Sequence, residues 1–192
     1  MIILVRHAES AANAGLPTDS PDGIALTALG ERQAGDFAKE WAVRPSAIVS
    51  SPFLRAMQTA EPLARRFDLP VETASVQEFT YLSPSKCIGT TAASRRAWVL
   101  EYWDLSDPDL RDGPGAETFR EFVERARGFL VSAGSRSSGN VIVFCHGQFM
   151  QMVRWLQEEP ARPVDSESMR HFRAMDLERQ VKHCQQYQLV AG

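Results

Sequence analysis

Two short runs of aliphatic residues, far apart in the chain, constrain the fold more than any other feature. "MIILV" (Met1 to Val5) and "NVIVFC" (Asn140 to Cys145) are almost continuously apolar and rich in β-branched residues. A strand without a polar face must be covered on both sides, which is typical of the central strands of a parallel sheet. Further candidate strands are Ser46 to Ser50, Val71 to Thr73 and Gln186 to Val190.

Segments with helical periodicity lie between these runs. The first extends from Thr27, a suitable N-cap, to Trp41. The second is expected to begin with Pro52 at its first helical position, and the clearest stripe covers residues 116–131 and stops at Gly134. The residues expected on the buried faces of the three helices are Leu29, Ala34, Phe37, Ala38 and Trp41, then Met57, Ala60, Ala64 and Phe67, then Phe119, Phe122, Val123, Ala126, Phe129 and Leu130.

Strands that alternate with helices predict an α/β fold with three layers, α/β/α, around a mainly parallel central sheet. The chain has 192 residues, the length of one domain, and we expect residues 1–192 to form it. The segment from Phe79 to Pro114 departs from the alternation. It is rich in Ser, Thr, Pro and Gly and has one expected helix, near Ala92 to Trp103. We interpret residues 79–114 as a small lid inserted over the active side.

Composition argues against several classes of protein. The formal net charge is −3 and no block of like charge stands out, so neither nucleic acid nor a membrane surface is an expected partner. No apolar run approaches the ~20 residues that cross a bilayer, and the N-terminal run is too short for a signal peptide. We therefore expect a cytoplasmic protein. Cys87, Cys145 and Cys184 are odd in number and lack Cys-x-x-Cys spacing, which argues against a disulfide framework or a structural zinc site.

Chemically capable residues follow four of the predicted strands. Arg6 and His7 follow the first, Arg55 lies one turn into the helix after the second, Glu78 comes shortly after the third, and His146 follows the fourth. Ligands of open parallel sheets bind beyond the carboxyl ends of the strands, so these side chains are expected to converge. Arginine can bind two phosphate oxygens, histidine can attack phosphorus, and a carboxyl group can protonate a leaving alkoxide. The sequence therefore predicts a site for a phosphoryl group.

Other catalytic arrangements do not fit the residues. A cysteine phosphatase needs an arginine six positions after its cysteine, but Gln151 stands at that spacing from Cys145. "GPGAE" lacks the third glycine of a dinucleotide fingerprint and follows no strand, so we expect a turn there. His171 and His183 lie in polar C-terminal sequence and are expected to be structural or at the surface.

Five motifs resemble those of the histidine phosphatase superfamily, which includes the cofactor-dependent phosphoglycerate mutases. "LVRHAESAAN" is similar to the family signature after the first strand, and "LTALGERQA" resembles its first helix. "SSPFLRAMQTA" resembles the second arginine motif, "GPGAETFREFVERA" the segment before the last major helix, and "VIVFCHG" the second histidine strand. The resemblance extends from Met1 to about Trp155.

The resemblance implies a role for each residue of the predicted site. His7 would attack phosphorus in line and form a phosphohistidine that water then hydrolyses. Arg6, Arg55 and His146 would bind the phosphoryl oxygens, and Glu78 would act first as general acid and then as general base. No metal ion or other cofactor is implied, because the arginines and His146 supply the positive charge. Further neutral donors would be Asn13 and the backbone N–H groups of Gly147 and Gln148.

The sequence departs from the family pattern at two places. Ala8 stands where a glycine commonly follows the nucleophilic histidine. "EFTYLSPSKC" lacks the glycine and tryptophan that commonly follow the acid. Glu72 and Glu101 therefore stay open as alternatives to Glu78.

Three functions are compatible with these residues. A phosphatase acting on phosphomonoesters of small molecules is favoured, because the chain is shorter than the mutases and its loop from Asn13 to Leu26 lacks their extended pattern. Adjacent Arg95 and Arg96 resemble the paired arginines of mutases, although a solvated helix face is the better explanation. The third function is a non-catalytic module that binds a phosphorylated ligand.

The sequence identifies neither the leaving group of the substrate nor the oligomeric state, for which a homodimer is one expectation. The lid should decide the leaving group, and it offers aromatic and cationic side chains whose positions the sequence does not give: Tyr81, Lys86, Arg95, Arg96, Trp98 and Trp103.

Overall fold

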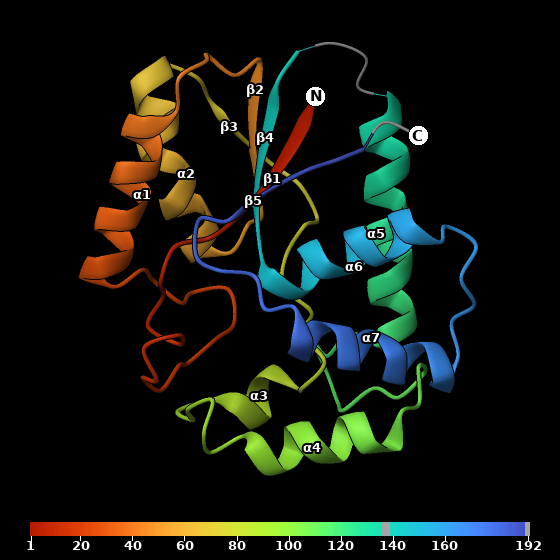
Figure 1. The fold of residues 1–192 in the computed structure, drawn as a ribbon. Helices are drawn as coiled ribbons and strands as arrows, with labels where there is room; N and C mark the ends of the chain where they lie inside the picture. Colours follow the sequence, from red (N-terminus) through yellow and green to blue (C-terminus); the bar gives the residue numbers. More distant parts are fainter. Residues whose placement is uncertain (136–138, 191–192) are drawn as a thin grey trace.

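A five-stranded sheet forms the centre of the molecule in the computed structural model, which describes residues 1–135 and 139–190 (Figure 1). The spatial order is β3-β2-β4-β1-β5, with β5 antiparallel to β1 and the other neighbours parallel. The predicted α/β fold with a mainly parallel sheet is confirmed. The strands are β1 (Ile2–Arg6), β2 (Ala47–Ser50), β3 (Val71–Thr73), β4 (Val141–Cys145) and β5 (Gln186–Gln188).

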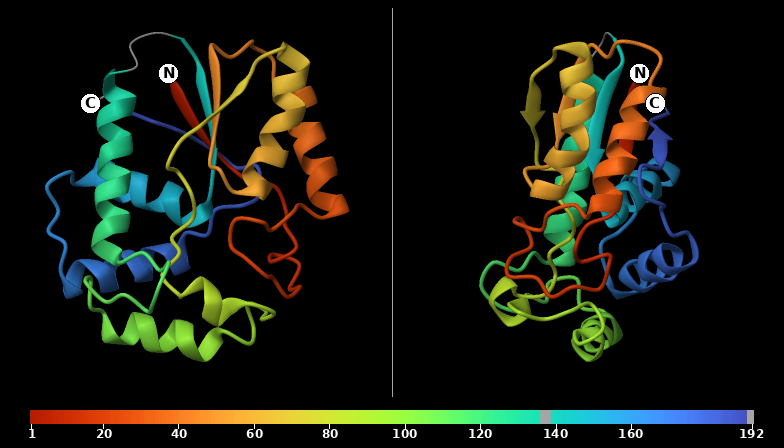
Figure 2. Two further views of the ribbon diagram at one scale, coloured as in Figure 1. Left: turned by 180° about the vertical axis from the view of Figure 1, so that it is seen from behind. Right: turned by 90° about the vertical axis from the view of Figure 1, so that its left-hand side faces the viewer.

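Helices cover both faces of the sheet and complete the three predicted layers (Figure 2). On one face lie α1 (Ala28–Glu40) and α2 (Leu54–Phe67), and on the other lie α5 (Phe119–Ser135) and α6 (Gly147–Glu158). Beyond the carboxyl ends of the strands lie α3 (Pro84–Cys87), α4 (Arg96–Leu105) and α7 (Ser166–Glu178). None of the helices within residues 1–135 and 139–190 is long and apolar enough to cross a membrane.

The continuously apolar strands divide their side chains between two cores. Ile2 and Leu4 of β1 pack with α5 and α6, whereas Ile3 and Val5 pack with α1 and α2. The same alternation occurs along β4, because successive side chains of a strand point to opposite faces. The buried central strands provide a rigid support for the residues at their carboxyl ends.

Three local expectations were wrong. The second helix begins at Leu54 and not at Pro52, because the chain first makes a bend in which the backbone N–H of Phe53 donates to Ser51 Oγ at 3.2 Å. Leu29 is exposed, and Gly30 takes its place on the buried face of α1. The lid holds the additional short helix α3, and its main helix is shifted toward the C-terminus, ending at Leu105.

No sequence expectation covered α7. Its apolar residues Met169, Phe172 and Met175 are buried, and Asp165 caps it by accepting a hydrogen bond from Ser168 N at 2.8 Å. The cap and the spacing of the apolar residues are visible in the sequence. The helix was not expected because charged and polar residues make up most of the segment.

Gly30 allows the loop that follows β1 to pack against the start of α1. A Cβ atom at Gly30 would lie 2.0 Å from the backbone oxygen of Glu9. The carboxylate of Glu9 accepts a hydrogen bond from Thr27 Oγ1 at 2.7 Å, and its backbone N–H donates to Gln33 Oε1 at 2.9 Å. The absence of a side chain at Gly30 permits this close approach, and the hydrogen bonds of Glu9 then hold the segment directly after His7 in place.

We expect Gly30→Ala to lower the free energy of unfolding by about 1–3 kcal/mol, because the new methyl group must displace the Glu9 backbone. Urea unfolding followed by circular dichroism measures the change. Gly35→Ala is the matched control, since it lies in the same helix with open space around it. It should be neutral or stabilise the protein by up to ~1 kcal/mol. Equal effects of the two substitutions would contradict the proposed packing.

Candidate active site

Two histidines meet where the parallel strands β1 and β4 end. Arg6 pairs with Cys145 in the register of these strands, so His7 and His146 follow at the same level. The backbone N–H of His7 donates to the Cys145 carbonyl at 2.9 Å, and the imidazole ring centres lie 5.0 Å apart. Both side chains are buried. The structure thus brings the two histidines together at the carboxyl edge of the sheet.

The ring of His7 is held in one tautomer. Its Nδ1 lies 2.6 Å from the backbone oxygen of Ala8, a group that only accepts hydrogen bonds, so Nδ1 carries the proton and Nε2 a lone pair. Burial is the main reason that the pKa of His7 is well below its ordinary value, and the charge of Arg55 adds to the effect. The ring is therefore neutral near pH 7, with Nε2 available as a nucleophile or base.

Arg55 is a buried cation in contact with this lone pair. Its Nε donates to His7 Nε2 at 3.2 Å, and its Nη1 donates to the backbone oxygen of Pro21 at 2.7 Å. Burial lowers the pKa of Arg55 to about 10, partly offset by the carboxylate of Glu78, so the guanidinium stays charged near neutral pH. A buried charge is costly unless it is paired, so an anion at this position would be strongly favoured.

His146 has one ring nitrogen paired and one unpaired. Its Nε2 lies 2.9 Å from Ser51 Oγ. Its Nδ1 is buried and has no hydrogen-bond partner in the part of the chain that the structure describes, and the same holds for Arg6 Nε. Burial and then the charge of Arg55 lower the pKa of His146 well below its ordinary value. Buried polar atoms in proteins are nearly always paired, so these two nitrogens are candidate contacts for a bound ligand, although His146 is not among the residues that line the cavity beside His7.

The C-terminal segment packs against Arg6. Arg6 Nη1 donates to the backbone oxygen of Val181, and the carbonyl of Arg6 accepts from Cys184 N at 3.0 Å. The ring centre of His183 lies 6.4 Å from that of His7. His183, which we expected to be structural or at the surface, is therefore half-buried next to the site. Its sequence neighbours gave no signal, because β5 alone brings the segment back to β1.

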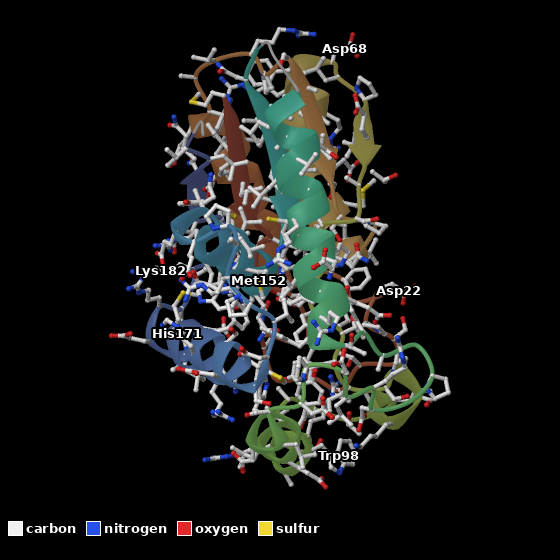
Figure 3. The ribbon with its side chains drawn as sticks, turned by 90° about the vertical axis from the view of Figure 1, so that its right-hand side faces the viewer. Asp22, Asp68, Trp98, Met152, His171 and Lys182 are labelled. Atoms are coloured by element: carbon white, nitrogen blue, oxygen red, sulfur yellow. The ribbon has the colours of Figure 1, made fainter. Side chains whose placement is uncertain are left out.

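His171 and the start of the C-terminal segment lie on the same side of the molecule. Figure 3 places His171 on α7 at the surface, as expected, and Lys182 in the segment that follows α7. His171 is exposed and contacts Arg162 at 3.2 Å.

Glu78 is anchored through one carboxyl oxygen. Its Oε1 accepts hydrogen bonds from the backbone N–H groups of Gln148 at 3.1 Å and Phe79 at 3.3 Å. Burial raises the pKa of Glu78, while the charges of Arg55 and Arg6 oppose this rise. The carboxyl group of Glu78 therefore keeps its proton to a higher pH than a solvent-exposed glutamate does. Its second oxygen, Oε2, accepts neither of these backbone hydrogen bonds.

Arg125 of α5 holds the segment before Glu78 through hydrogen bonds to its backbone. Arg125 forms a two-pronged ion pair with Glu117, with both distances 2.7 Å. Its Nη1 also donates to the backbone oxygens of Ser75 at 3.2 Å and Gln77 at 3.0 Å. The "GPGAE" stretch is the expected turn, and its glutamate additionally holds the arginine that orients the chain before Glu78.

The alternatives to Glu78 lie elsewhere. Glu72 is exposed on β3 and Glu101 is exposed on α4, and neither lines the cavity beside His7.

A cavity of about 290 Å³ lies between this edge of the sheet and the lid. Asn13 lines it from the loop after β1, and its Oδ1 accepts from Ser10 Oγ at 2.8 Å, which leaves the amide NH₂ to face other groups. Gly147 lies beside Arg6, since a Cβ at Gly147 would be 3.6 Å from Arg6 Nε. The residues that line the cavity include Arg6, His7, Phe53, Arg55, Glu78, Tyr81 and Arg95.

Arg95 fastens the loop after β1 to the lid. Its Nη2 donates to Thr18 Oγ1 at 2.6 Å and its Nε to Thr90 Oγ1 at 2.6 Å. The same two threonines form an isolated antiparallel bridge, in which Thr18 N donates to Thr90 O at 3.1 Å. Arg96 is exposed and does not line the cavity. The adjacent arginines thus have different environments, and Arg95 closes the cavity on its lid side.

A second cavity, of about 400 Å³, lies between α5 and the sheet. Apolar side chains form most of its wall, and its lining shares no residue with that of the cavity beside His7. It is therefore separate from the candidate site. Within the described residues, no group of three or more His, Cys, Asp or Glu side chains is arranged to hold a metal ion.

The motifs, the sheet order and the paired histidines correspond to a known family. The model of the histidine phosphatase superfamily (branch 1) matches residues 2–178. The chain belongs to the histidine phosphatase superfamily.

Relatives in this superfamily include named phosphatases. The uncharacterized phosphatase PhoE of Bacillus subtilis is 30% identical over 153 residues, which cover 76% of this chain and 71% of that protein. A mycobacterial glucosyl-3-phosphoglycerate phosphatase has a similar structure, with a TM-score of 0.71 and 22% identity over 96% of this chain and 90% of that one. A phosphoserine phosphatase from Entamoeba histolytica has a TM-score of 0.71 and 19% identity over 96% and 87%. The two solved structures show the shared fold.

We expect His7 to hold its proton on Nδ1 and to stay neutral at a pH where free histidine is charged, because burial and Arg55 disfavour the imidazolium. Two-bond ¹H–¹⁵N correlation spectra of histidine-labelled protein measure both properties, and His7→Gln assigns the signals. The spectrum should keep an unprotonated Nε2 as the pH falls through ~6.5, the ordinary histidine value. A proton on Nε2, or a charged ring near neutral pH, would show that the site is organised differently.

Proposed function

We propose that this protein is a phosphatase that hydrolyses phosphomonoesters of small molecules through a phosphohistidine on His7, without a metal ion. The observation that carries the proposal is the neutral Nε2 of buried His7, held 3.2 Å from the buried Arg55 cation and in the same cavity as Glu78. A nucleophile, an anion clamp and a proton donor are the three groups that phosphoryl transfer to histidine requires.

Substrate binding uses the buried cations. The phosphate dianion enters between half-buried Arg6 and buried Arg55 and adds negative charge beside two cations that have no carboxylate hydrogen-bonded to them within the described residues. The unpaired Nδ1 of His146 and Nε of Arg6 supply further donors. Asn13 and the backbone at Gly147 complete the set of neutral donors.

The role that we assign to Gln148 differs from the one expected from the sequence. Its backbone N–H donates to Glu78 Oε1, so it holds the acid and does not bind phosphate. The second residue of α6 thereby links the phosphate site to the proton donor.

In the first chemical step the lone pair of His7 Nε2 forms a bond to phosphorus as the bond to the leaving oxygen breaks. The leaving oxygen takes the proton of Glu78, which becomes a carboxylate. His7 gains positive charge in this step, and the hydrogen bond from Nδ1 to the Ala8 carbonyl stabilises it. Arg55 Nε, which rests on Nε2 in the free protein, turns to the phosphoryl oxygens when phosphorus occupies that lone pair.

In the second step water attacks the phosphohistidine. The carboxylate of Glu78 takes a proton from the water as its oxygen bonds to phosphorus. The phosphorus–nitrogen bond breaks, and its electron pair returns to His7 Nε2. Inorganic phosphate leaves, and both His7 and Glu78 regain their starting protonation states.

The relatives support hydrolysis of small phosphorylated molecules. PhoE is named a phosphatase, and the two solved structures are named as phosphatases of glucosyl-3-phosphoglycerate and phosphoserine. The cavity of about 290 Å³ has the volume of a site for a small molecule, which suits a phosphorylated small-molecule substrate. No observation favours a mutase specifically, because Arg95 is engaged by Thr18 and Thr90 and Arg96 is exposed.

We expect steady hydrolysis of p-nitrophenyl phosphate in the presence of a chelator, and a loss of at least ~10³-fold in kcat for His7→Ala, because the variant has no nucleophile. A rapid alkaline quench of enzyme mixed with ³²P-labelled substrate should trap labelled phosphohistidine in the wild type only. His171→Ala, an exposed histidine, is the matched control and should keep full activity.

Other outcomes distinguish the remaining functions. Isomerisation of a phosphoglycerate that greatly exceeds phosphate release identifies a mutase, and phosphate binding without turnover identifies a binding module. Full activity of His7→Ala removes the covalent mechanism, and loss of activity on chelation removes metal independence.

We expect Glu78→Gln to affect substrates according to their leaving groups. An alkyl phosphate such as glycerol phosphate needs a proton on its leaving oxygen, so its kcat/KM should fall by roughly 10²–10⁴-fold, whereas p-nitrophenyl phosphate should lose much less. Because the acid form of Glu78 is the active one, the wild-type rate with the alkyl substrate should decline as pH rises through the raised pKa of Glu78. Glu101→Gln, at the exposed alternative position, should match the wild type. Equal losses with both substrates would assign the acid elsewhere.

A further inference from the structure

A second carboxyl group lies beside the candidate site, on a helix without an assigned role. Asp176 lies near the C-terminal end of α7, and this end of the helix lies below the start of α6 (Figure 1). Its side chain is only 14% exposed. Asp176 Oδ2 accepts hydrogen bonds from Gln148 Nε2 at 3.0 Å and from Arg173 Nη1 at 3.4 Å.

Gln148 connects this carboxyl group to the proposed proton donor. Its side-chain amide donates to Asp176, and its own backbone N–H donates to Glu78 Oε1 at 3.1 Å. A single residue therefore holds two acidic side chains that come from distant parts of the chain. A carboxyl pair at one site is an arrangement in which each charge affects the proton affinity of the other.

The charged groups around the two acids oppose one another. Arg6 from β1 and Arg55 from α2 face Glu78 and favour its carboxylate, whereas Asp176 disfavours it. The phenol of Tyr81, in the lid, is near both acids, and burial raises its pKa. Burial has the largest effect on the pKa of Glu78, followed by the two arginines and then Asp176.

Asp176 itself is subject to burial, which raises its pKa. Its two donors, Gln148 and Arg173, counteract this because hydrogen bonds to a carboxylate favour the ionised form. Arg6 faces Asp176 as well as Glu78, so one guanidinium lies in the field of both acids.

Building on the proposed phosphatase activity, we propose that Asp176 is a positioning residue whose negative charge, tied to Glu78 through Gln148, offsets Arg6 and favours the proton-donating form of Glu78. The phosphate site uses half-buried Arg6 and buried Arg55, yet the same arginines favour loss of the proton that the leaving group requires. A carboxylate held by Gln148 and Arg173 within the field of Arg6 reduces this conflict. Asp176 touches neither substrate nor phosphate in this role.

The test is the pH dependence of kcat/KM for glycerol phosphate, which reports the ionisation of the free enzyme. In Asp176→Asn the alkaline decline should move to lower pH by roughly 0.5–1 unit, the size expected for removal of one partly screened neighbouring charge. Asp176→Glu keeps the charge and should leave the decline near its wild-type position. The ionisation of the substrate is the same for every variant, so differences between variants belong to the protein.

Glu178→Gln is the matched control, because it removes one negative charge from an exposed position on the same helix. It should leave the pH profile unchanged. The rate with p-nitrophenyl phosphate, whose leaving group needs no proton, should change little in Asp176→Asn. If thermal melting shows that Asp176→Asn does not fold, Asp176→Ser replaces it as the variant without charge.

An unmoved decline in the uncharged variant, or equal shifts in Asp176→Asn and Asp176→Glu, would overturn the role of Asp176. Failure of the phosphatase proposal looks different. In that case the wild type shows no hydrolysis, or His7→Ala stays active, or Glu78→Gln leaves the alkaline decline in place. A decline that depends on Glu78 but not on Asp176 refutes only the inference about Asp176.

Discussion

The parallel pairing of β1 with β4 is the interaction on which the rest of the site depends. Its register sets Arg6 opposite Cys145, and the hydrogen bond from His7 N to the Cys145 carbonyl extends the ladder by one residue. A shift of one residue would send His7 to the opposite face of the sheet, away from His146. The two apolar cores on either side hold this register, because every side chain of both strands has a defined face.

Electrostatic strain characterises the site in the absence of an anion. Burial disfavours the charged forms of all the cationic groups, and the response differs with their chemistry: the histidines become neutral, whereas Arg55 keeps its proton. The result places an uncharged imidazole beside a guanidinium cation, and burial keeps the imidazole uncharged at a lower pH than in a solvent-exposed histidine. In the proposed mechanism, binding of a phosphate dianion adds a counter-charge for these groups.

Local sequence patterns were sufficient for the strands and for the convergence of Arg6, His7, Arg55 and His146, because strand ends in a parallel sheet share one edge. They were insufficient to predict residue positions that depend on packing between segments far apart in the sequence. The approach of His183 depends on an antiparallel edge strand, and the attachment of Glu78 to the backbone of Gln148 depends on how a loop meets the start of α6. Asp176 belongs to a helix whose short buried stripe is surrounded by charged residues. The residues that neighbour His183, Glu78 and Asp176 in the sequence therefore do not predict these contacts.

The antiparallel strand β5 has a consequence for when the site can exist. β1 precedes both of its neighbours in the chain, since β4 begins at Val141 and β5 at Gln186. A nascent chain that ends before residue 140 contains His7 without the strand that supports it, and one that ends before residue 181 lacks the carbonyl that holds Arg6. The candidate site therefore assembles only from segments that lie far apart in the sequence, and a chain that lacks residues 140–188 holds His7 and Arg55 without the elements that enclose them.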